Sequence, residues 1–546
     1  MLDVLIRGGR LLDGTGTPSR RDDVGIEDGR VVRIGALDGA EARMVIEAAD
    51  RHVAPGFVDI HTHSDIGLLQ DATAENIVRQ GVTTHVTGNC GVSPAPVAER
   101  TRALAERQFP DYDHPVAYAW STFAEYLDVL DRSGVGVNVV PLLGHGTVRL
   151  AVLGYERRPP RAEELDRMRA HVEEGMDAGA FGMSTGLVYP PGCFGETDEV
   201  VALAEVVARH GGLYASHIRG ERETVLDAVR ECIAIGERSG ARTQISHNAP
   251  KWGGTHLLPE VIALWEDARA RELDVGVDND AHTDLGWGLR DGLPQWTHEL
   301  TNAELVAVLG SDDRRRELAA ETVEDVRPAY GPVGLLKHGV WERIWLLPGN
   351  GVESALAGRT VAWIAAERGV DGWTAYLDLI VETGGTGQAD FDYIDPDVVG
   401  AVASHPLVAL CSDGHVLPKG VQETDAPPYM PCSYGEYPGV LERFVAREGL
   451  LTVEEAVRKM TSLPASRMGI ADRGVLAPGA AADVVVFDLP RVRDRATNLF
   501  PHDPITDNYP HRPPEGIDWV LVNGEVAVAE GEPTGAVAGL VLRHGR

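Results

Sequence analysis

Ala54-Pro55-Gly56-Phe57-Val58-Asp59-Ile60-His61-Thr62-His63-Ser64-Asp65 is a Pro-Gly turn followed by an apolar run that ends in two histidines. Side chains two residues apart on a β-strand point to the same side, so His61 and His63 can converge on one metal ion. An apolar run that stops at His-x-His predicts a buried barrel strand that delivers ligands at its C-terminal end. The competing interpretation is a strand with two hydrogen-bonded core histidines.

Outward from this stretch, short β-rich runs alternate with helical patterns along most of the chain. Two such helical patterns cover 162–178 and 221–235, and we expect Gly236 to stop the second. Eight β/α units predict an α/β fold, a TIM-type (β/α)8 metallo-dependent hydrolase barrel. The β-rich runs are 53–61, 82–90, 135–143, 180–187, 212–217, 242–247, 273–280 and 407–412.

The two ends of the chain show a different sequence pattern, in which short predicted strands are separated by turns. Such strands cannot bury their apolar faces alone, so we expect residues 1–52 and 474–546 to form one small β-sandwich, with 540–542 as its last strand. We expect residues 53–473 to form the barrel. The segment between its seventh and eighth strands is too long for an ordinary βα connection. This length predicts an inserted lid or subdomain at about 285–345.

Composition narrows the class of protein. A chain of 546 residues is too long for one compact core, and 43% hydrophobic with 24% charged residues is ordinary for a soluble globular protein. The formal net charge of −33 argues against nucleic acid and anionic membranes as partners. Five cysteines, an odd number, suggest no disulfide framework and a cytoplasmic location, and we find neither a signal peptide nor an apolar run of ~18 residues.

Side chains that bind metals stand at the ends of the predicted strands. Histidine, thiolate and carboxylate are the usual zinc ligands, and so many of them at strand ends are hard to explain as core polar residues. The sequence therefore predicts a metal site at the C-terminal face of the barrel. The candidate ligands are His61, His63, Cys90, His217, His247 and Asp413.

Several motifs resemble those of the N-acyl-D-amino-acid deacylases (D-aminoacylases), which belong to the amidohydrolase superfamily. The resemblance extends over nearly the whole chain, and the Gly-Asn-Cys-Gly segment is its most specific part. The motifs are His61-Thr62-His63-Ser64-Asp65, Gly88-Asn89-Cys90-Gly91, Gly144-His145-Gly146, Ser184-Thr185-Gly186-Leu187-Val188-Tyr189, Ser216-His217-Ile218-Arg219 and Ser412-Asp413-Gly414.

The resemblance implies one or two Zn²⁺ ions per chain. Cys90 would ligate or bridge them, with His217 and His247 holding the tight zinc. A second, weaker position would be completed by His61, His63 and Asp413. Zinc activates a bound water and polarises the scissile amide, and Asp413 would act as the catalytic proton shuttle.

The expected substrate contacts are Lys251, His145, Tyr189, Arg219 and His282. His145 is equally compatible with an oxyanion contact and with a structural histidine. In the family a lysine, a Pro-Tyr pair and an arginine bind the substrate carboxylate. Here Lys251 matches the lysine, but His282 stands where the family has the tyrosine and Cys432 where it has the arginine. We therefore expect weak binding of a free substrate carboxylate, and a strong preference for the free acid would instead indicate that Arg219 or Lys419 replaces the arginine.

Three functions follow from these observations. The first is zinc-dependent deacylation of an N-acyl (D-)amino acid or related small-molecule amide. The second keeps the hydrolase but changes the substrate to a cyclic amide, a lactam or an amide with a masked carboxylate. The third, a non-catalytic scaffold, would have lost some of the ligands that are all present here. The sequence allows a homo-oligomer but does not indicate one.

Overall fold

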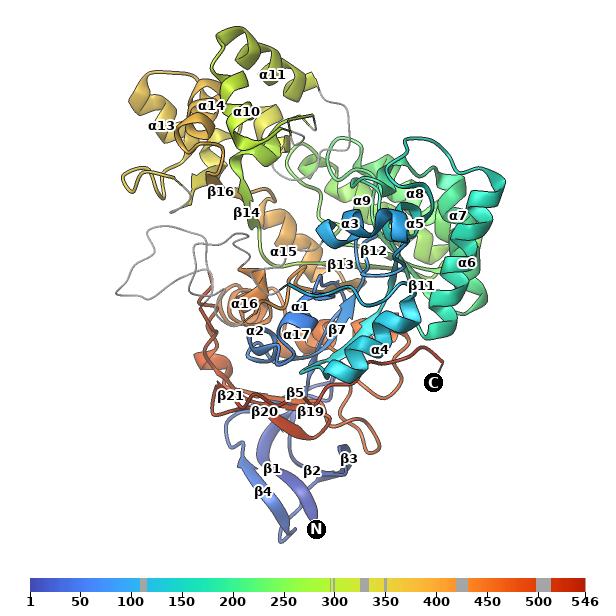
Figure 1. Cartoon of the computed structure of the whole chain (residues 1–546). Helices are drawn as coiled ribbons and strands as arrows, with labels where there is room; N and C mark the ends of the chain where they lie inside the picture. The colour runs from blue at the N-terminus through green and yellow to red at the C-terminus, as the bar shows by residue number, and fades with distance from the viewer. Residues whose placement is uncertain are drawn as a thin grey trace.

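The computed structural model describes residues 1–108, 115–294, 296–297, 300–324, 333–347, 351–418, 431–496 and 512–545, with the backbone alone at 107, 284 and 285. A barrel lies in the middle of the molecule. A sheet built from both chain ends lies at one end of it, and a group of inserted helices lies at the other (Figure 1). No helix in the described ranges is both long and apolar enough to cross a membrane.

The barrel consists of parallel strands in two hydrogen-bonded groups. The bridge between Thr62 and Gly414 joins the groups on one side, and β8 continues almost directly into β9 on the other. The predicted TIM-type barrel is therefore confirmed. The strands are β6 (Phe57–Asp59), β7 (Val82–Thr87) and β8 (Asn138–Pro141), followed by β9 (Leu143–Gly144), β10 (Gly182–Gly186), β11 (Leu213–His217), β12 (Arg242–Ile245), β13 (Val275–Asn279) and β17 (Val408–Leu410).

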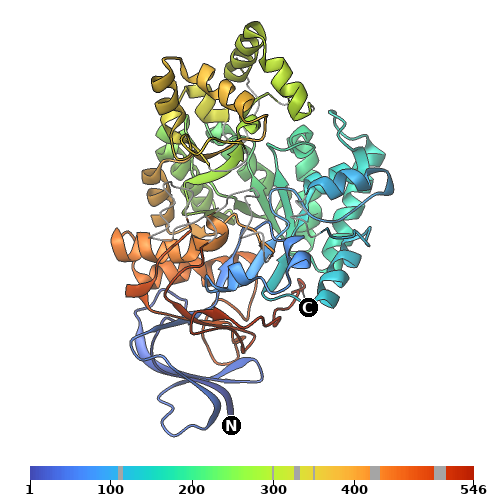
Figure 2. The ribbon, with the colours of Figure 1, turned by 60° about the vertical axis from the view of Figure 1, so that its left-hand side comes forward.

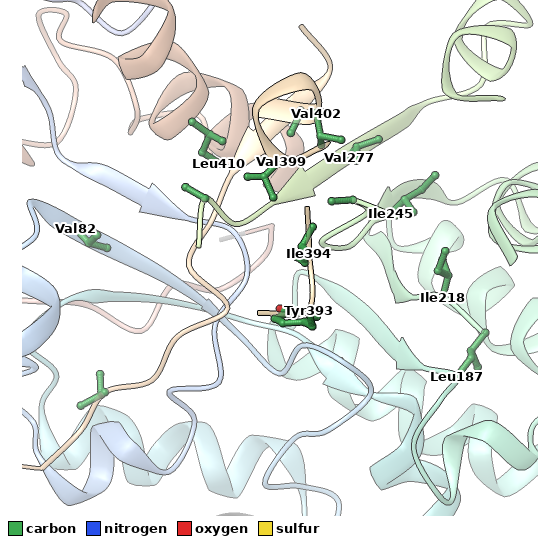
Figure 3. Close-up of a cluster of buried hydrophobic side chains, with 14 of the residues drawn as sticks. Val82, Leu187, Ile218, Ile245, Val277, Tyr393, Ile394, Val399, Val402 and Leu410 are labelled. Carbon is green, nitrogen blue, oxygen red and sulfur yellow. The ribbon is translucent and has the colours of Figure 1, made fainter. Parts of the chain in front are cut away.

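Both faces of the barrel strands are buried, because helices cover the outside and side chains fill the inside. Every residue of β7 is buried, as expected for a strand in a fully covered parallel sheet. On the outer face, Val277 and Leu410 lie near Val399 and Val402 of helix α15 (Pro396–Ser404) (Figure 3). This packing holds the strand ends, and so the predicted ligands, in fixed positions.

The predicted helix over 162–178 is confirmed as α6 (Ala162–Ala178), which ends at Gly179 in the left-handed conformation. The prediction for the next helical pattern was wrong at both ends. Helix α8 begins at Val225, runs through Gly236 and ends at Ser239, where Gly240 has a φ of +74°. Gly236 lacks a side chain for a packing reason, because a Cβ there would lie 1.9 Å from Thr243 Oγ1 on β12.

Strands from both chain ends pair in one sheet, with β18 (Val484–Phe487) beside β5 (His52–Pro55). Residues 540–542 do not join it, contrary to our expectation. They lie along β8 instead, where Val139 N donates to Leu540 O at 2.8 Å and Leu542 N donates to Val139 O at 2.8 Å. The rest of the sheet is formed by β1 (Leu2–Leu11), β2 (Arg20–Glu27), β3 (Arg30–Gly35), β4 (Ala42–Glu47), β19 (Ile517–Val522), β20 (Glu525–Ala529) and β21 (Glu532–Pro533).

The stretch between β13 and β17 forms a small sheet with helices, at the end of the molecule opposite the terminal sheet (Figure 2). The inserted elements continue to β16, so they extend beyond the predicted limit near 345. They are β14 (Asp284–Gly288), α10 (Asn302–Leu309), α11 (Asp312–Glu324), α12 (Val333–His338), β15 (Ile344–Leu346), α13 (Val361–Arg368), α14 (Gly372–Glu382) and β16 (Gln388–Asp392).

Candidate metal centre

The predicted ligands follow directly from the barrel strands, and three of them adopt an unusual backbone conformation. Cys90, His247 and Asp413 have positive φ values of 50°, 33° and 54°. Such values are rare outside glycine and cost on the order of 1–3 kcal/mol each. Strain of this kind gathers at functional sites, where it aims side chains that a regular strand would direct elsewhere.

Cys90 lies among three imidazoles. Its Sγ is 3.3 Å from His61 Nε2, 3.5 Å from His247 Nε2 and 3.6 Å from His217 Nδ1. All four residues are at most 5% exposed. Cys90, His217 and His247 offer ligand atoms that lie within 4.8 Å of one another, which is compact enough for one metal ion.

A second group of potential ligands shares Cys90 with the first. It consists of His61, His63, Cys90 and Asp413, whose ligand atoms also lie within 4.8 Å of one another. Asp413 Oδ1 is 3.0 Å from His63 Nε2 and 3.4 Å from His61 Nε2. The two groups are therefore adjacent, with the cysteine sulfur between them.

The surroundings of Cys90 and Asp413 favour the anionic forms of these two candidate ligands. Burial alone would raise the pKa of the Cys90 thiol, but His61, His217 and His247 hold it well below its ordinary value. Burial would likewise raise the pKa of Asp413, but His63 and His61 lower it. Asp413 Oδ1 is also a buried acceptor without a well-formed hydrogen bond. Thiolate, carboxylate and imidazole form a donor set that fits zinc, and a bound zinc ion would take the place of the protons that the raised pKa values of His61, His63 and His247 favour.

Glu221, which we did not predict, holds the far sides of two of these histidines. Its carboxylate is 3.2 Å from His247 Nδ1 and 3.5 Å from His217 Nε2. Carboxylates in this position fix the tautomer and orientation of metal-binding histidines. An acidic residue four positions after a predicted histidine ligand was the available signal.

Asp278 at the end of β13 has a similar position. Its Oδ1 accepts a hydrogen bond from the backbone N–H of His247 at 2.9 Å and lies 3.4 Å from His61 Nδ1. Its Oδ2 accepts a hydrogen bond from Gln244 at 2.8 Å. Asp278 thus contacts one residue of each group of candidate ligands, His247 and His61.

Two of the predicted substrate contacts lie beside the metal centre. Tyr189 Oη is 3.1 Å from His217 Nδ1. Lys251 is 3% exposed, and its Nζ donates to His247 O at 3.3 Å, lies 3.8 Å from Glu221 and lies 5.1 Å from the centre of the Tyr393 ring. The ammonium of Lys251 is therefore already surrounded by protein groups.

The other predicted contacts are bound to acidic side chains of the protein. His145 Nε2 lies 2.8 Å from Glu199, and Arg219 contacts Glu231 at 2.9 Å. His282 lies between Glu436, 2.5 Å from its Nδ1, and Asp494, 3.3 Å from its Nε2. These partners favour the structural role for His145. Cys432 is buried at the start of α16 (Cys432–Gly439), and Lys419 lies outside the described residues.

A TIM-type barrel with clustered histidine, cysteine and carboxylate groups at its strand ends defines a metal-dependent hydrolase. A model of the amidohydrolase family matches residues 44–340 and 342–528. The chain belongs to this family, and within it to the D-aminoacylases, also called N-acyl-D-amino-acid deacylases.

The relatives extend over the whole chain. A D-aminoacylase and an N-acyl-D-glutamate deacylase of Alcaligenes xylosoxydans xylosoxydans are each 35% identical to it, over 99% and 100% of this chain and 97% of either relative. A D-aminoacylase crystal structure matches with a TM-score of 0.77 at 30% identity, covering 100% of both chains. The N-acyl-D-glutamate deacylase of Bordetella bronchiseptica, in complex with zinc and a phosphonate inhibitor, matches with a TM-score of 0.75 at 32% identity, covering 99% of both chains.

Proposed function

We propose that the protein hydrolyses the amide bond of an N-acyl-D-amino acid or a related small-molecule amide, with zinc as the metal. The observation that carries the proposal is the position of Cys90 Sγ within 3.6 Å of ring nitrogens of His61, His217 and His247. The names of the full-length relatives support the substrate class.

Cys90, His217 and His247 would hold the tighter ion, because a thiolate and two imidazoles form a soft, buried donor set. His61, His63 and Asp413 would complete a weaker second position. In the binuclear metal centre of one related D-aminoacylase, one metal ion activates the enzyme and the second attenuates it. We infer the same order here, so that the first zinc activates. When bound, zinc supplies Lewis-acid polarisation of the carbonyl and activation of water.

Asp413 would move the proton. Its lowered pKa keeps it a carboxylate at neutral pH, and its Oδ1 lies beside the candidate ligands, 3.0 Å from His63 Nε2. It would accept a proton from the attacking water and donate it to the leaving nitrogen, as general base and then general acid. Tyr189, beside His217, would contact the carbonyl side of the substrate.

A second substrate class is favoured by the way the expected carboxylate contacts are engaged. Lys251 contacts Glu221 and the Tyr393 ring, and His282 lies between Glu436 and Asp494. Neither is free to bind a substrate carboxylate without giving up a protein partner. An amide whose carboxylate is absent or masked would avoid this cost, and the same holds for a cyclic amide or lactam.

The test is hydrolysis by zinc-loaded protein of N-acetyl-D-methionine, its methyl ester and its L-enantiomer. Hydrolysis of the D-compounds supports the proposal, and preference for the ester supports the second substrate class. A strong preference for the free acid would contradict the second substrate class and support an ordinary D-aminoacylase. Failure to hydrolyse all three compounds and a set of lactams would contradict amide hydrolysis.

A further inference from the structure

Lys251 contacts the groups that hold the candidate ligands of the tighter ion. Its Nζ donates to His247 O at 3.3 Å and lies 3.8 Å from Glu221. Glu221 in turn lies 3.2 Å from His247 Nδ1 and 3.5 Å from His217 Nε2. The backbone of Lys251 is fixed beside Glu221, because its N–H donates to Glu221 O at 2.8 Å. A displacement of Lys251 would therefore change the surroundings of two candidate ligands.

Trp252, the next residue, joins this loop to the inserted subdomain, which comprises the elements from β14 to β16. Its indole Nε1 donates to Asp392 O at 3.1 Å, and its backbone N–H donates to Tyr393 O at 3.3 Å. Arg343 Cζ lies 4.3 Å from the centre of the Trp252 ring, and the same guanidinium pairs with the Asp392 carboxylate. Tryptophan is the aromatic side chain that binds a guanidinium best. One side chain therefore holds the loop to the ends of β15 and β16 by two different kinds of contact.

Tyr393 extends the contact from the inserted subdomain to Lys251 itself. The Lys251 ammonium lies 5.1 Å from the centre of the Tyr393 ring, and Lys251 is 3% exposed. Cation–π contacts of this kind are strongest where water is excluded. Tyr393 is fixed to the barrel in turn, since its N–H donates to Thr283 O at 3.0 Å. The inserted subdomain thus contacts Lys251 directly and, through Trp252, also holds the loop that carries it.

We propose that the inserted subdomain sets the zinc affinity of the barrel site, with Trp252 as the positioning residue that holds Lys251 against His247 and Glu221. This inference rests on the proposed zinc centre and does not depend on which amide is hydrolysed. Substitution of side chains that orient metal ligands changes metal affinity by about 10- to 100-fold. Trp252 acts one contact further from the metal, so we expect an effect near the lower end of that range.

The test is the zinc affinity of the whole chain, measured by competition with a chelator. Trp252→Leu should weaken zinc binding by about 10-fold, because it removes both the ring beneath Arg343 and the donor to Asp392. Arg343→Met removes the same cation–π contact from the other side and should act in the same direction. Trp252→Phe keeps a ring for Arg343 and should bind zinc more tightly than Trp252→Leu. The matched control is Trp363→Leu on the exposed surface of α13, where Arg359 lies 4.7 Å from the Trp363 ring, and it should keep the wild-type affinity.

A double-mutant cycle with Lys251→Met separates positioning from packing. Lys251→Met should itself weaken zinc binding. Adding Trp252→Leu to it should change the affinity by less than about 2-fold, because the residue that Trp252 positions is already lost. Arg343→Met takes the place of Trp252→Leu in the cycle if the latter does not fold.

Three results would overturn the inference while leaving the proposed function intact. The first is wild-type zinc affinity in Trp252→Leu, even with a lower midpoint of urea unfolding, as a residue that only packs would give. The second is full additivity of the two substitutions, and the third is unchanged zinc affinity in Lys251→Met. Failure of the wild-type protein to bind zinc would instead overturn the proposed function, and this inference with it.

Discussion

At the scale of single residues, the function depends on which groups hold the metal and which group moves the proton. Asp413 is a candidate for both roles. Its Oδ1 lies beside two candidate ligands, 3.0 Å from His63 Nε2 and 3.4 Å from His61 Nε2. The buried group of Cys90, His217 and His247 is complete without it. The two roles can therefore be separated by substitution.

We expect Asp413→Asn to lower kcat by at least ~10²-fold, because an amide cannot accept the proton from water. The tighter zinc should stay bound, since its three ligands are untouched. Steady-state kinetics with metal analysis of the same sample checks both parts, and Asp128→Asn on the surface of α4 (Phe123–Ser133) is the control. Turnover near the wild-type rate in Asp413→Asn would refute the shuttle.

Glu221 makes a different prediction, because it contacts the histidines and not the reacting groups. Glu221→Gln should weaken zinc binding by about 10- to 100-fold, as the far nitrogens of His217 and His247 lose their shared carboxylate. Competition with a chelator measures this directly. Glu223→Gln, two residues further on and paired with His338, is the matched control. Equal zinc affinity in the two variants would show that Glu221 does not position the ligands.

At the scale of elements, the sequence predicted the barrel strands well, because an apolar run that ends in histidine or cysteine is visible locally. It failed where packing decided the outcome. Gly236 suggested the end of a helix, but the helix continues because that glycine allows close contact with Thr243. Residues 540–542 read as a sandwich strand, yet they lie along β8, a pairing that no local pattern reveals.

The candidate site also has a part that the sequence predicts and a part that it does not. That the candidate ligands lie together could be predicted, because their residue types are chemically restricted and their spacing follows the strands. The partners of His145, Arg219 and His282 could not, because Glu199, Glu231 and Glu436 come from other elements. A histidine that is free to bind substrate and one that is bound to a glutamate have the same local sequence.

The close approach of β10 to the Cys90 loop gives a prediction at this scale. A Cβ at Gly186 would lie 2.0 Å from the carbonyl oxygen of Cys90, so Gly186→Ala must displace the loop. We expect weaker zinc retention with all ligands still present, measured by zinc content after dialysis. Gly400→Ala within α15 meets only a leucine side chain at 3.2 Å and should retain zinc. Normal retention in Gly186→Ala would show that the loop can shift without cost.

At the scale of the whole molecule, the terminal sheet and the barrel share a buried polar contact. Asp483 Oδ2 accepts hydrogen bonds from Arg473 and, at 3.0 Å, from Asn138 of β8, while its Oδ1 accepts one from Asn523 N at 2.7 Å. Asp483 is 4% exposed and Arg473 is 6% exposed. Loss of Asp483 would leave the buried charge of Arg473 with Asp472, 3.9 Å away, as its remaining ion-pair partner in the described part of the chain.

Asp483→Ala should therefore destabilise the protein by about 3–5 kcal/mol, the usual cost of breaking a buried ion pair. The measurement is the midpoint of urea unfolding, followed by tryptophan fluorescence. Asp128→Asn, on the exposed surface of α4, should shift the midpoint little. Similar midpoints for the two variants would mean that the sheet and the barrel are held together mainly by apolar packing.

The central claim is that the whole fold serves one metal centre at the barrel mouth. The most direct test is metal analysis of purified, active protein together with its activity on the amide substrates before and after chelation. We predict about one to two zinc ions per chain, loss of hydrolysis when they are removed and recovery when zinc is returned. Full hydrolytic activity in protein that contains no transition metal would contradict the claim.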